Sequence, residues 1–333
     1  MYWYIKYPLI AILILCVLGI GSLFFRGCGK SPQEPQIGTE TPSDVGVTVD
    51  KGVSSNNSSS PDSAQPGIQP PRVVKVNPEL EEMLANAQAQ LERGGLVAAR
   101  NCALNVLGSE DVVEFDATWY KAASLVNEIN RRLMNSTAPS VEKKRYIVQP
   151  GNSLERIARM KHTAVGALMR MNEIVQPADG RDPVVRPNQT LFYIEGNWSI
   201  RVSKQQYLLI LYFNGELYRI YTVGIGRDDR TPTGTFLITE KLIDPAWCPP
   251  GKSIPFGDPE NVLGTRWMKL TPTEGTDPTL EGYGIHGTWE PESCGSSCSA
   301  GCVRMRNEEV EELYDFIPVP GGSTPPVRVV IQE

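Results

Sequence analysis

The chain lacks the features that would mark a nucleic-acid-binding protein or a disulfide scaffold. Its 333 residues hold 32 Lys and Arg against 38 Asp and Glu, a net charge of −6. Nucleic-acid-binding domains usually carry a basic stripe, and none is visible, so we expect no nucleic-acid partner. Seven cysteines are few for a disulfide scaffold, and the odd number leaves at least one thiol over even if all the others pair.

The N-terminal part lacks a small-residue cleavage site after its apolar run from Pro8 to Phe25. This run is about as long as a helix that spans a bilayer, whereas a cleaved signal peptide usually has a shorter apolar core. We expect residues 1–30 to form an uncleaved membrane anchor, with a cleaved signal or a lipid anchor at Cys28 as alternatives. Positive residues flank both ends of the run, so the charges leave its orientation open.

Residues 31–76 lack apolar periodicity and are rich in Ser, Pro, Gly, Gln and Asp, which predicts a disordered linker. Within residues 77–137, apolar side chains recur at helical spacing in three segments, and Asp116 caps the third. Two of these helices around a glycine turn resemble one tetratricopeptide-type unit, but a single unit does not make a repeat array. We interpret this block as a short α-helical hairpin region that acts as a spacer.

Residues 145–195 follow the order strand, helix, helix, strand. The segments YIVQPGNSL, LMRMN and RPNQTLFYI closely resemble a LysM module over its whole length. This resemblance implies binding to glycan that contains N-acetylglucosamine, as in the peptidoglycan backbone. The implied contacts lie in the loops after the first strand and after the second helix, at Gly151, Asn152, Ser153, Asn172, Glu173 and Ile174.

Three cysteines, Cys294, Cys298 and Cys302, lie four residues apart in the C-terminal part. The paired C-x2-C spacing preferred by structural zinc is missing, and we expect no metal and no cofactor. Outside the cytoplasm a disulfide is more plausible. It would join Cys294 to Cys298, or one of these to Cys248.

Cys302 differs from its neighbours because it follows Gly301, where a glycine lets backbone approach a bound substrate. A thiol nucleophile needs a base, and His286 is the only histidine in this half of the chain. The backbone N–H groups of Gly301 and Cys302 could form an oxyanion hole. On spacing alone, this pairing of Cys302 with His286 is a weak signal.

From Trp198 onward, short alternating strands with Gly and Pro turns, including Asn214-Gly215, predict a β-sandwich or barrel-like domain. The segments SKQQYLLILYFNGELYRIYTVGIG, RTPTGTF, ENVLGTRWMKL, YGIHGT and S-x-G-C-V-R-M occur in that order. With these landmarks, residues 198–333 resemble the catalytic domain of the L,D-transpeptidases, the YkuD-like fold. The resemblance implies a mainly-β sandwich that performs acyl transfer on peptidoglycan.

The resemblance also implies a role for each motif residue. Cys302 would attack the L-centre carbonyl of the third stem-peptide residue, expel D-alanine and form a thioester. An amine of a second stem would resolve this thioester into a 3→3 cross-link. His286 would be the base, with the backbone of Gly287 orienting it and Gly301 contributing to the oxyanion hole. The residues expected to bind substrate or support the loop are Arg304, Ser299 and Trp289.

One position departs from the family pattern. Ala300 stands where many members have a histidine, two residues before the nucleophile. Two alternative functions stay open: a degenerate wall-binding protein without activity, for which Ala300 is the only support, and an L,D-carboxypeptidase of the same fold, which would use water as the acceptor. For an active enzyme the partners are peptidoglycan stem peptides, glycan and the membrane, with the catalytic domain periplasmic or otherwise extracytoplasmic, or secreted if the signal is cleaved.

Overall fold

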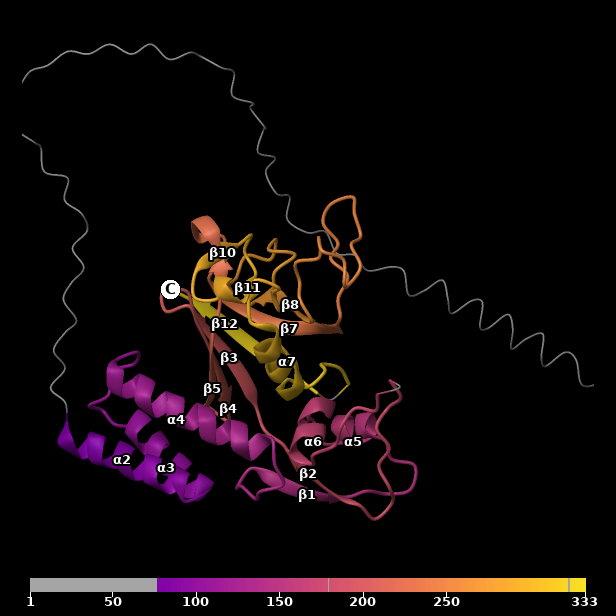
Figure 1. Cartoon of the computed structure of the whole chain (residues 1–333). Coiled ribbons are helices and arrows are strands. Elements are labelled where there is room, and N and C mark those ends of the chain that lie inside the picture. Colours follow the sequence, from indigo (N-terminus) through magenta and orange to yellow (C-terminus); the bar gives the residue numbers. More distant parts are fainter. Residues whose placement is uncertain (1–76, 179, 323) are drawn as a thin grey trace, which may run out of the picture.

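The computed structural model describes residues 77–178, 180–322 and 324–333. The expected anchor and linker at residues 1–76 lie outside this part of the chain. Within the described ranges, no helix has the length and apolar character needed to cross a membrane. Three helices, a small α/β unit and a β domain follow one another along the sequence (Figure 1).

The helical block contains α2 (Pro78–Glu92), α3 (Leu96–Leu107) and α4 (Ala117–Met134). Two helices begin at side-chain caps, because Asn77 accepts a hydrogen bond from the Glu79 N–H and Asp116 accepts one from the Trp119 N–H. Helices α2 and α3 pack side by side, and α3 packs on α4. The expected hairpin region is therefore a bundle of three helices.

The interpretation of this block as a spacer is wrong, because its apolar face is buried against the β domain. Strands β4 (Leu208–Phe213) and β5 (Glu216–Thr222) lie beside α4 (Figure 1). The buried cluster at this junction joins helical and strand residues, namely Ala87, Ala103, Trp119, Ala123, Val126, Leu208, Ile210 and Leu217. Burial of such a surface is favourable by ~25 cal/mol per Å², so the helices are fixed to the sheet.

The second unit has the predicted order, with β1 (Lys143–Ile147), α5 (Leu154–Met160), α6 (Val165–Met171) and β2 (Thr190–Ile194). The two strands pair antiparallel, with Lys143 opposite Ile194 and Ile147 opposite Thr190. Ser153 caps α5 by accepting a hydrogen bond from the Arg156 N–H. The strand β1 begins at Lys143, before the predicted start of the module at residue 145.

The β domain is built on one curled eight-stranded sheet, of which β4 and β5 are two strands. The other six are β3 (Trp198–Ser203), β7 (Gly234–Ile243), β8 (Arg266–Thr273), β9 (Gly284–His286), β11 (Val303–Arg304) and β12 (Arg328–Gln332). Their order is β11-β9-β8-β7-β12-β3-β4-β5. The pairs β11–β9 and β12–β3 are parallel, and the rest are antiparallel.

The predicted mainly-β character is confirmed, and of the predicted sandwich or barrel-like forms the described residues show one curled sheet. Hydrogen bonds join the long strands into a single sheet, and only β6 (Ile225–Gly226) and β10 (Ser297–Ser299) form a small separate pair. The predicted hairpin turn lies between β4 and β5, where Asn214 and Gly215 have φ of 53° and 87°. Positive φ at both turn residues is typical of Asn-Gly hairpins.

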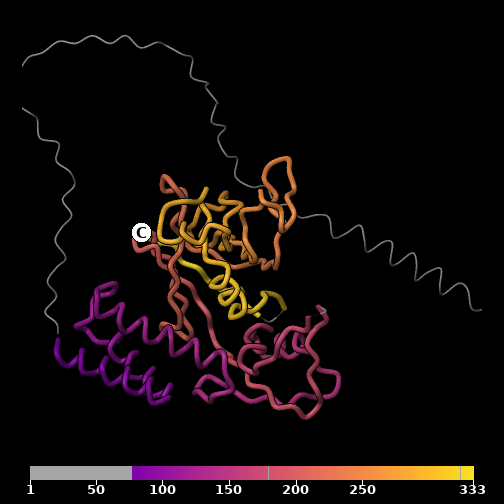
Figure 2. Tube along the Cα trace, viewed as in Figure 1, coloured from indigo at the N-terminus to yellow at the C-terminus, as the bar shows by residue number. Residues whose placement is uncertain are grey.

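Helix α7 (Asn307–Phe316) joins the β domain to the LysM-like unit. Arg170 Nε on α6 donates to Asp315 Oδ2 on α7 at 2.7 Å. His162 Nδ1 lies 3.2 Å from Thr324 Oγ1. One continuous apolar core runs through both units, so the LysM-like unit has a fixed place on the β domain (Figure 2).

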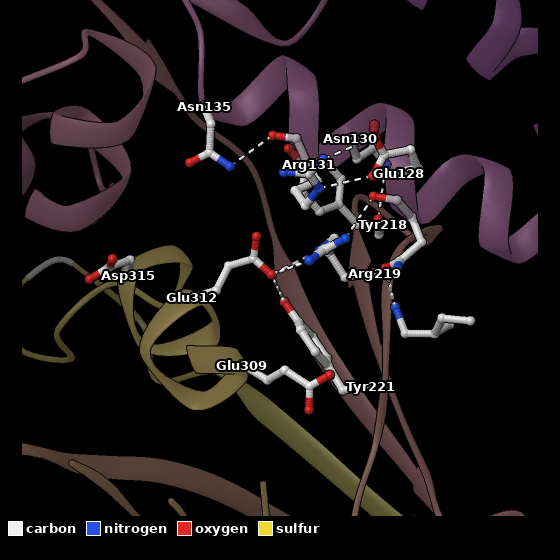
Figure 3. Close-up of polar contacts among 12 residues, drawn as sticks. Glu128, Asn130, Arg131, Asn135, Tyr218, Arg219, Tyr221, Glu309, Glu312 and Asp315 are labelled. Carbon is white, nitrogen blue, oxygen red and sulfur yellow. Dashed lines mark hydrogen bonds and ion pairs between the residues drawn. The ribbon is translucent and has the colours of Figure 1, made fainter. Parts of the chain in front are cut away.

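A buried polar cluster lies between α4, β5 and α7 (Figure 3). Arg219 on β5 forms an ion pair with Glu312 on α7, and its Nη1 donates to the Asn127 carbonyl on α4 at 2.7 Å. The Tyr221 hydroxyl donates to Glu312 at 3.2 Å. Arg219 and Glu312 are only 5 % and 7 % exposed. This cluster ties the helical block, the sheet and α7 together in one place.

Candidate active site

The nucleophile candidate and its base are brought together by two short neighbouring strands. Strands β9 and β11 pair in parallel, with Arg304 opposite His286 and Val303 opposite Ile285. Side chains alternate along a strand, so Arg304 and His286 point to the same face. Cys302 directly precedes β11, and its Sγ contacts the carbonyl of Gly282, four residues before His286. The pairing of β9 with β11 therefore brings the two segments that carry Cys302 and His286 side by side.

Hydroxyl groups shape the loop that carries Cys302. Ser299 Oγ donates to the Cys302 carbonyl at 2.7 Å and accepts from the Gly301 N–H at 3.1 Å. Thr231 Oγ1 donates to the Gly301 carbonyl at 2.9 Å and accepts from the Gly226 N–H at 2.7 Å. Thr231 is fully buried and belongs to the RTPTG segment, so this distant motif supports the nucleophile loop.

A glycine is required at position 301. Its φ of 145° lies in a region that L side chains rarely adopt. A Cβ atom there would also lie 2.7 Å from Tyr283 Cε1 and 3.0 Å from the Arg230 carbonyl oxygen. Gly301 thus lets the loop pass between these groups. In this structure the Gly301 N–H donates to Ser299 Oγ, and its expected contribution to an oxyanion hole stays a prediction.

The Cys302 thiol is partly buried beside backbone groups of the strand before His286. Its Sγ donates to the Gly282 carbonyl at 3.6 Å. Burial raises the pKa of Cys302 to about 11, while a backbone hydrogen bond from Gly284 and the positive charge of Arg304 act in the opposite direction. The thiol is therefore uncharged at neutral pH in the resting site.

His286 is buried, with 3 % of its surface exposed. Its Nδ1 lies 2.6 Å from the Gly287 carbonyl oxygen and must donate to it, because a carbonyl can only accept. The ring stacks on Trp267 at a centroid distance of 5.8 Å. Burial lowers the pKa of His286 to about 4; hydrogen bonds with backbone groups of Gly287 and Leu263 oppose this, and Arg304 adds to it.

The resting pair is thus a neutral thiol and a neutral imidazole. In the described part of the chain, no hydrogen bond joins Cys302 Sγ to His286, since the thiol donates to Gly282 and Nδ1 donates to Gly287. With Nδ1 protonated, Nε2 is the nitrogen that can accept a proton. An unprotonated Nε2 is what a base for the thiol needs. The catalytic roles of Cys302 and His286 themselves stay predictions.

Of the expected substrate-side residues, Arg304 lies opposite His286 on the neighbouring strand and Ser299 binds the Cys302 carbonyl. Arg304 Nη1 is 3.3 Å from Glu290 Oε2, and the Arg304 Nε is buried without an acceptor in the described structure. Trp289 is 50 % exposed, and its ring centroid lies 6.0 Å from that of Phe256. Phe256 belongs to the long segment 244–265 between β7 and β8, which projects from the sheet (Figure 2).

The expected disulfide is wrong for two of its three candidates, because Cys294 and Cys298 are free thiols. Both lie near Gly224. Cys298 Sγ would be 2.7 Å from a Cβ at that glycine, and Cys294 Sγ donates to the Arg304 carbonyl at 3.9 Å.

Sequence reasoning did not single out Tyr283, whose ring lies against Gly301 and whose pKa is raised by burial and by the nearby Cys302. Its position three residues before His286, at the start of the segment YGIHGT, is the sequence signal that could have identified it.

Two of the expected glycan contacts have internal partners. Asn172 Nδ2 donates to the Leu168 and Phe192 carbonyls, and its Oδ1 accepts from the Phe192 N–H at 2.7 Å. Asn152 Oδ1 accepts from the Tyr146 hydroxyl and the Gln149 N–H. These asparagines hold the loops in shape. The exposed members of the expected set are Gly151, Ser153 and Glu173, with Ile174 half-buried.

Comparisons with known proteins agree with this architecture. A model of the L,D-transpeptidase catalytic domain matches residues 197–331, and a LysM model matches residues 146–192. The chain is 39 % identical over 127 residues to the putative L,D-transpeptidase YqjB of Bacillus subtilis, covering 38 % of this chain and 69 % of that protein. It is 32 % identical over 180 residues to the putative L,D-transpeptidase YkuD of Bacillus licheniformis, covering 52 % of this chain and 93 % of that protein.

Among solved structures, an L,D-transpeptidase from Mycobacterium smegmatis shares 18 % identity, with a TM-score of 0.33 over 44 % of this chain and 64 % of that one. This overlap is too low for a comparison of the two sites. The sequence relatives are sufficient on their own, since one of them is covered almost completely. The chain belongs to the L,D-transpeptidase family and carries a LysM domain before its catalytic domain.

Proposed function

We propose that this protein is a cysteine-dependent peptidoglycan L,D-transpeptidase. The family supports the general reaction, and one observation supports the assignment to residues: β9, which ends at His286, pairs with β11, which begins directly after Cys302. The Thr231 and Ser299 hydroxyls fix the backbone that carries the thiol. Such preorganisation is what a nucleophile needs to meet a carbonyl in a productive geometry.

The reaction would proceed in two acyl transfers. Cys302 Sγ attacks the L-centre carbonyl of the third stem residue as the thiol proton moves to His286 Nε2. The amide bond then breaks, His286 returns the proton to the leaving amine, and D-alanine departs from the thioester. The amine of a second stem attacks the thioester carbonyl and loses a proton to His286. The C–S bond then breaks, and His286 passes this proton to Cys302 Sγ, which regenerates the thiol. The product is a 3→3 cross-link.

The environment of each group suits this exchange. Because the pKa of His286 is lowered to about 4, the ring is neutral over the physiological range and can accept the thiol proton. The hydrogen bond to Gly287 leaves Nε2 as the accepting nitrogen. The backbone N–H groups of Gly301 and Cys302 are the proposed donors of the oxyanion hole.

We further propose that the LysM domain binds glycan through the exposed loop residues Gly151, Ser153 and Glu173. Binding of the polymer would raise the local concentration of stem peptides without adding contacts at the thiol. The apolar run Pro8–Phe25 would anchor the chain in a membrane, with the catalytic domain on the extracytoplasmic side, where peptidoglycan lies. The orientation follows from this function.

Incubation with purified disaccharide-tetrapeptide tests the proposal. We expect cross-linked dimers and released D-alanine, and no dimers from Cys302→Ala or His286→Ala. The control is Cys298→Ala, because this thiol lies outside the proposed chemistry and its loss should leave dimer formation intact. Tripeptide without dimers would instead assign a carboxypeptidase, and unchanged substrate would assign a wall-binding protein. Intact mass after incubation with a carbapenem should show a covalent adduct that Cys302→Ala lacks.

A further inference from the structure

Asn307, the first residue of α7, lies next to the backbone that holds His286. Its Oδ1 accepts a hydrogen bond from the Thr265 N–H at 3.2 Å. Asparagine near a helix start often caps the helix. Here, however, the N-cap is Arg306 and no side chain caps the helix. The Asn307 amide oxygen is instead directed at the neighbouring strands.

Two glycines make room for this amide. A Cβ atom on Gly287 would lie 2.2 Å from Asn307 Oδ1, and one on Gly264 would lie 2.3 Å from it. Gly264 also has φ of 62°, which favours glycine. The Asn307 oxygen therefore lies in direct contact with the backbone of both segments.

These two segments are the ones whose backbones contact the imidazole. The Gly287 carbonyl accepts from His286 Nδ1 at 2.6 Å. The backbone of Leu263, directly before Gly264, interacts with the same ring and acts to raise its pKa. Thr265 is the residue that Asn307 binds. A shift of the Asn307 side chain would release both backbone segments around His286.

We infer that Asn307 is a positioning residue that fixes the tautomer and orientation of His286 through the backbone of Gly287 and of the Leu263–Thr265 segment. A histidine whose Nδ1–H is bound to a fixed carbonyl presents Nε2 as the base. The inference rests on the proposed function of His286 as the base. It adds a residue that touches neither the substrate nor the thiol.

Nuclear magnetic resonance of ¹⁵N-histidine-labelled protein tests the inference directly. The chain has only two histidines, so His162 serves as an internal reference and His162→Asn assigns the signals. We expect the wild type to show the Nδ1–H tautomer at His286, and Asn307→Ala to show a mixture of tautomers. Asn307→Asp keeps an oxygen for the Thr265 N–H and should restore the single tautomer.

Kinetics provide the second readout. A small displacement of a catalytic group can cost up to about 100-fold in rate. We therefore expect kcat to fall about 10- to 100-fold in Asn307→Ala with KM within about twofold, and to recover partly in Asn307→Asp. The matched control is Asn105→Ala, an exposed asparagine in helix α3, which should change neither readout.

The outcomes of these experiments separate the inference about Asn307 from the proposed function of the protein. An unchanged tautomer together with unchanged kcat in Asn307→Ala overturns the inference. If Asn307→Ala does not fold, a single Nδ1–H tautomer in Asn307→Leu, which keeps the volume but has no oxygen, overturns it as well. A wild-type protein that forms no thioester refutes the proposed function, yet the tautomer measurement still reports on Asn307.

Discussion

The state of the Cys302 thiol gives a quantitative prediction. Burial raises its pKa from 9.0 to about 11. At pH 7 a thiol with pKa of about 11 is ionised in ~1 of 10⁴ molecules, against ~1 of 10² for one with pKa of 9. Because the thiolate is the nucleophile, the resting enzyme should react with a small alkylating reagent about 100-fold more slowly than an exposed cysteine of ordinary pKa.

Iodoacetamide alkylation followed by peptide mass mapping measures this for Cys302 separately from the other cysteines. We expect the rate constant at Cys302 to rise about tenfold per pH unit from pH 7 to 10 without a plateau. The same protein in denaturing urea is the control, and there the rate should level off near pH 9. A plateau below pH 8 in the folded protein would show a preformed thiolate and refute the neutral pair of Cys302 and His286.

Three further predictions concern the residues that support this site. Glu312→Leu leaves the Arg219 charge buried without its partner and should lower the free energy of unfolding in urea by about 3–5 kcal/mol. The double variant Arg219→Met with Glu312→Leu should recover most of this loss. An unchanged unfolding midpoint in Glu312→Leu would contradict the prediction. Thr231→Val leaves the buried Gly226 N–H and Gly301 carbonyl without their hydroxyl partner. It should therefore lower the free energy of unfolding by about 1–3 kcal/mol and slow the acylation of Cys302 by a carbapenem. Thr231→Ser keeps the hydroxyl and should behave like the wild type. Because the pKa of His286 is about 4 when folded and 6.5 ordinarily, the unfolded chain binds the proton first as pH falls. The stability that depends on His286 is therefore present above pH 6.5 and lost towards pH 4, by at most about 3 kcal/mol. His286→Asn should remove this part of the acid sensitivity, and an identical pH dependence in the variant would count against it.

The local motifs allowed much of the domain structure to be predicted. The β-α-α-β order of the LysM unit and the Asn214-Gly215 turn follow from apolar spacing and turn chemistry, which act between near neighbours. The pairing of Cys302 with His286 was predicted because the two residues stand in the segments S-x-G-C-V-R-M and YGIHGT, which resemble motifs of the L,D-transpeptidases. In the structure His286 ends β9, and Cys302 directly precedes the neighbouring strand β11.

The packing partners were not predictable in this way. An amphipathic helix shows which face is buried but not what covers it, so α4 was interpreted as part of a spacer although it lies on β4 and β5. The internal hydrogen bonds of Asn172 were not predicted for the same reason. Its place in a loop indicated a glycan contact, whereas its amide closes the LysM fold internally.

The sequence by itself determined the two domains, the family and the identity of the proposed nucleophile and base, because these depend on local patterns of residue type. Only the tertiary structure decided how the thiol loop is held. Thr231 and Gly301 are 70 residues apart, and their hydrogen bond forms because β6 and β10 come together. Contacts between distant segments are fixed by the packing of the whole core, which no short stretch of sequence specifies.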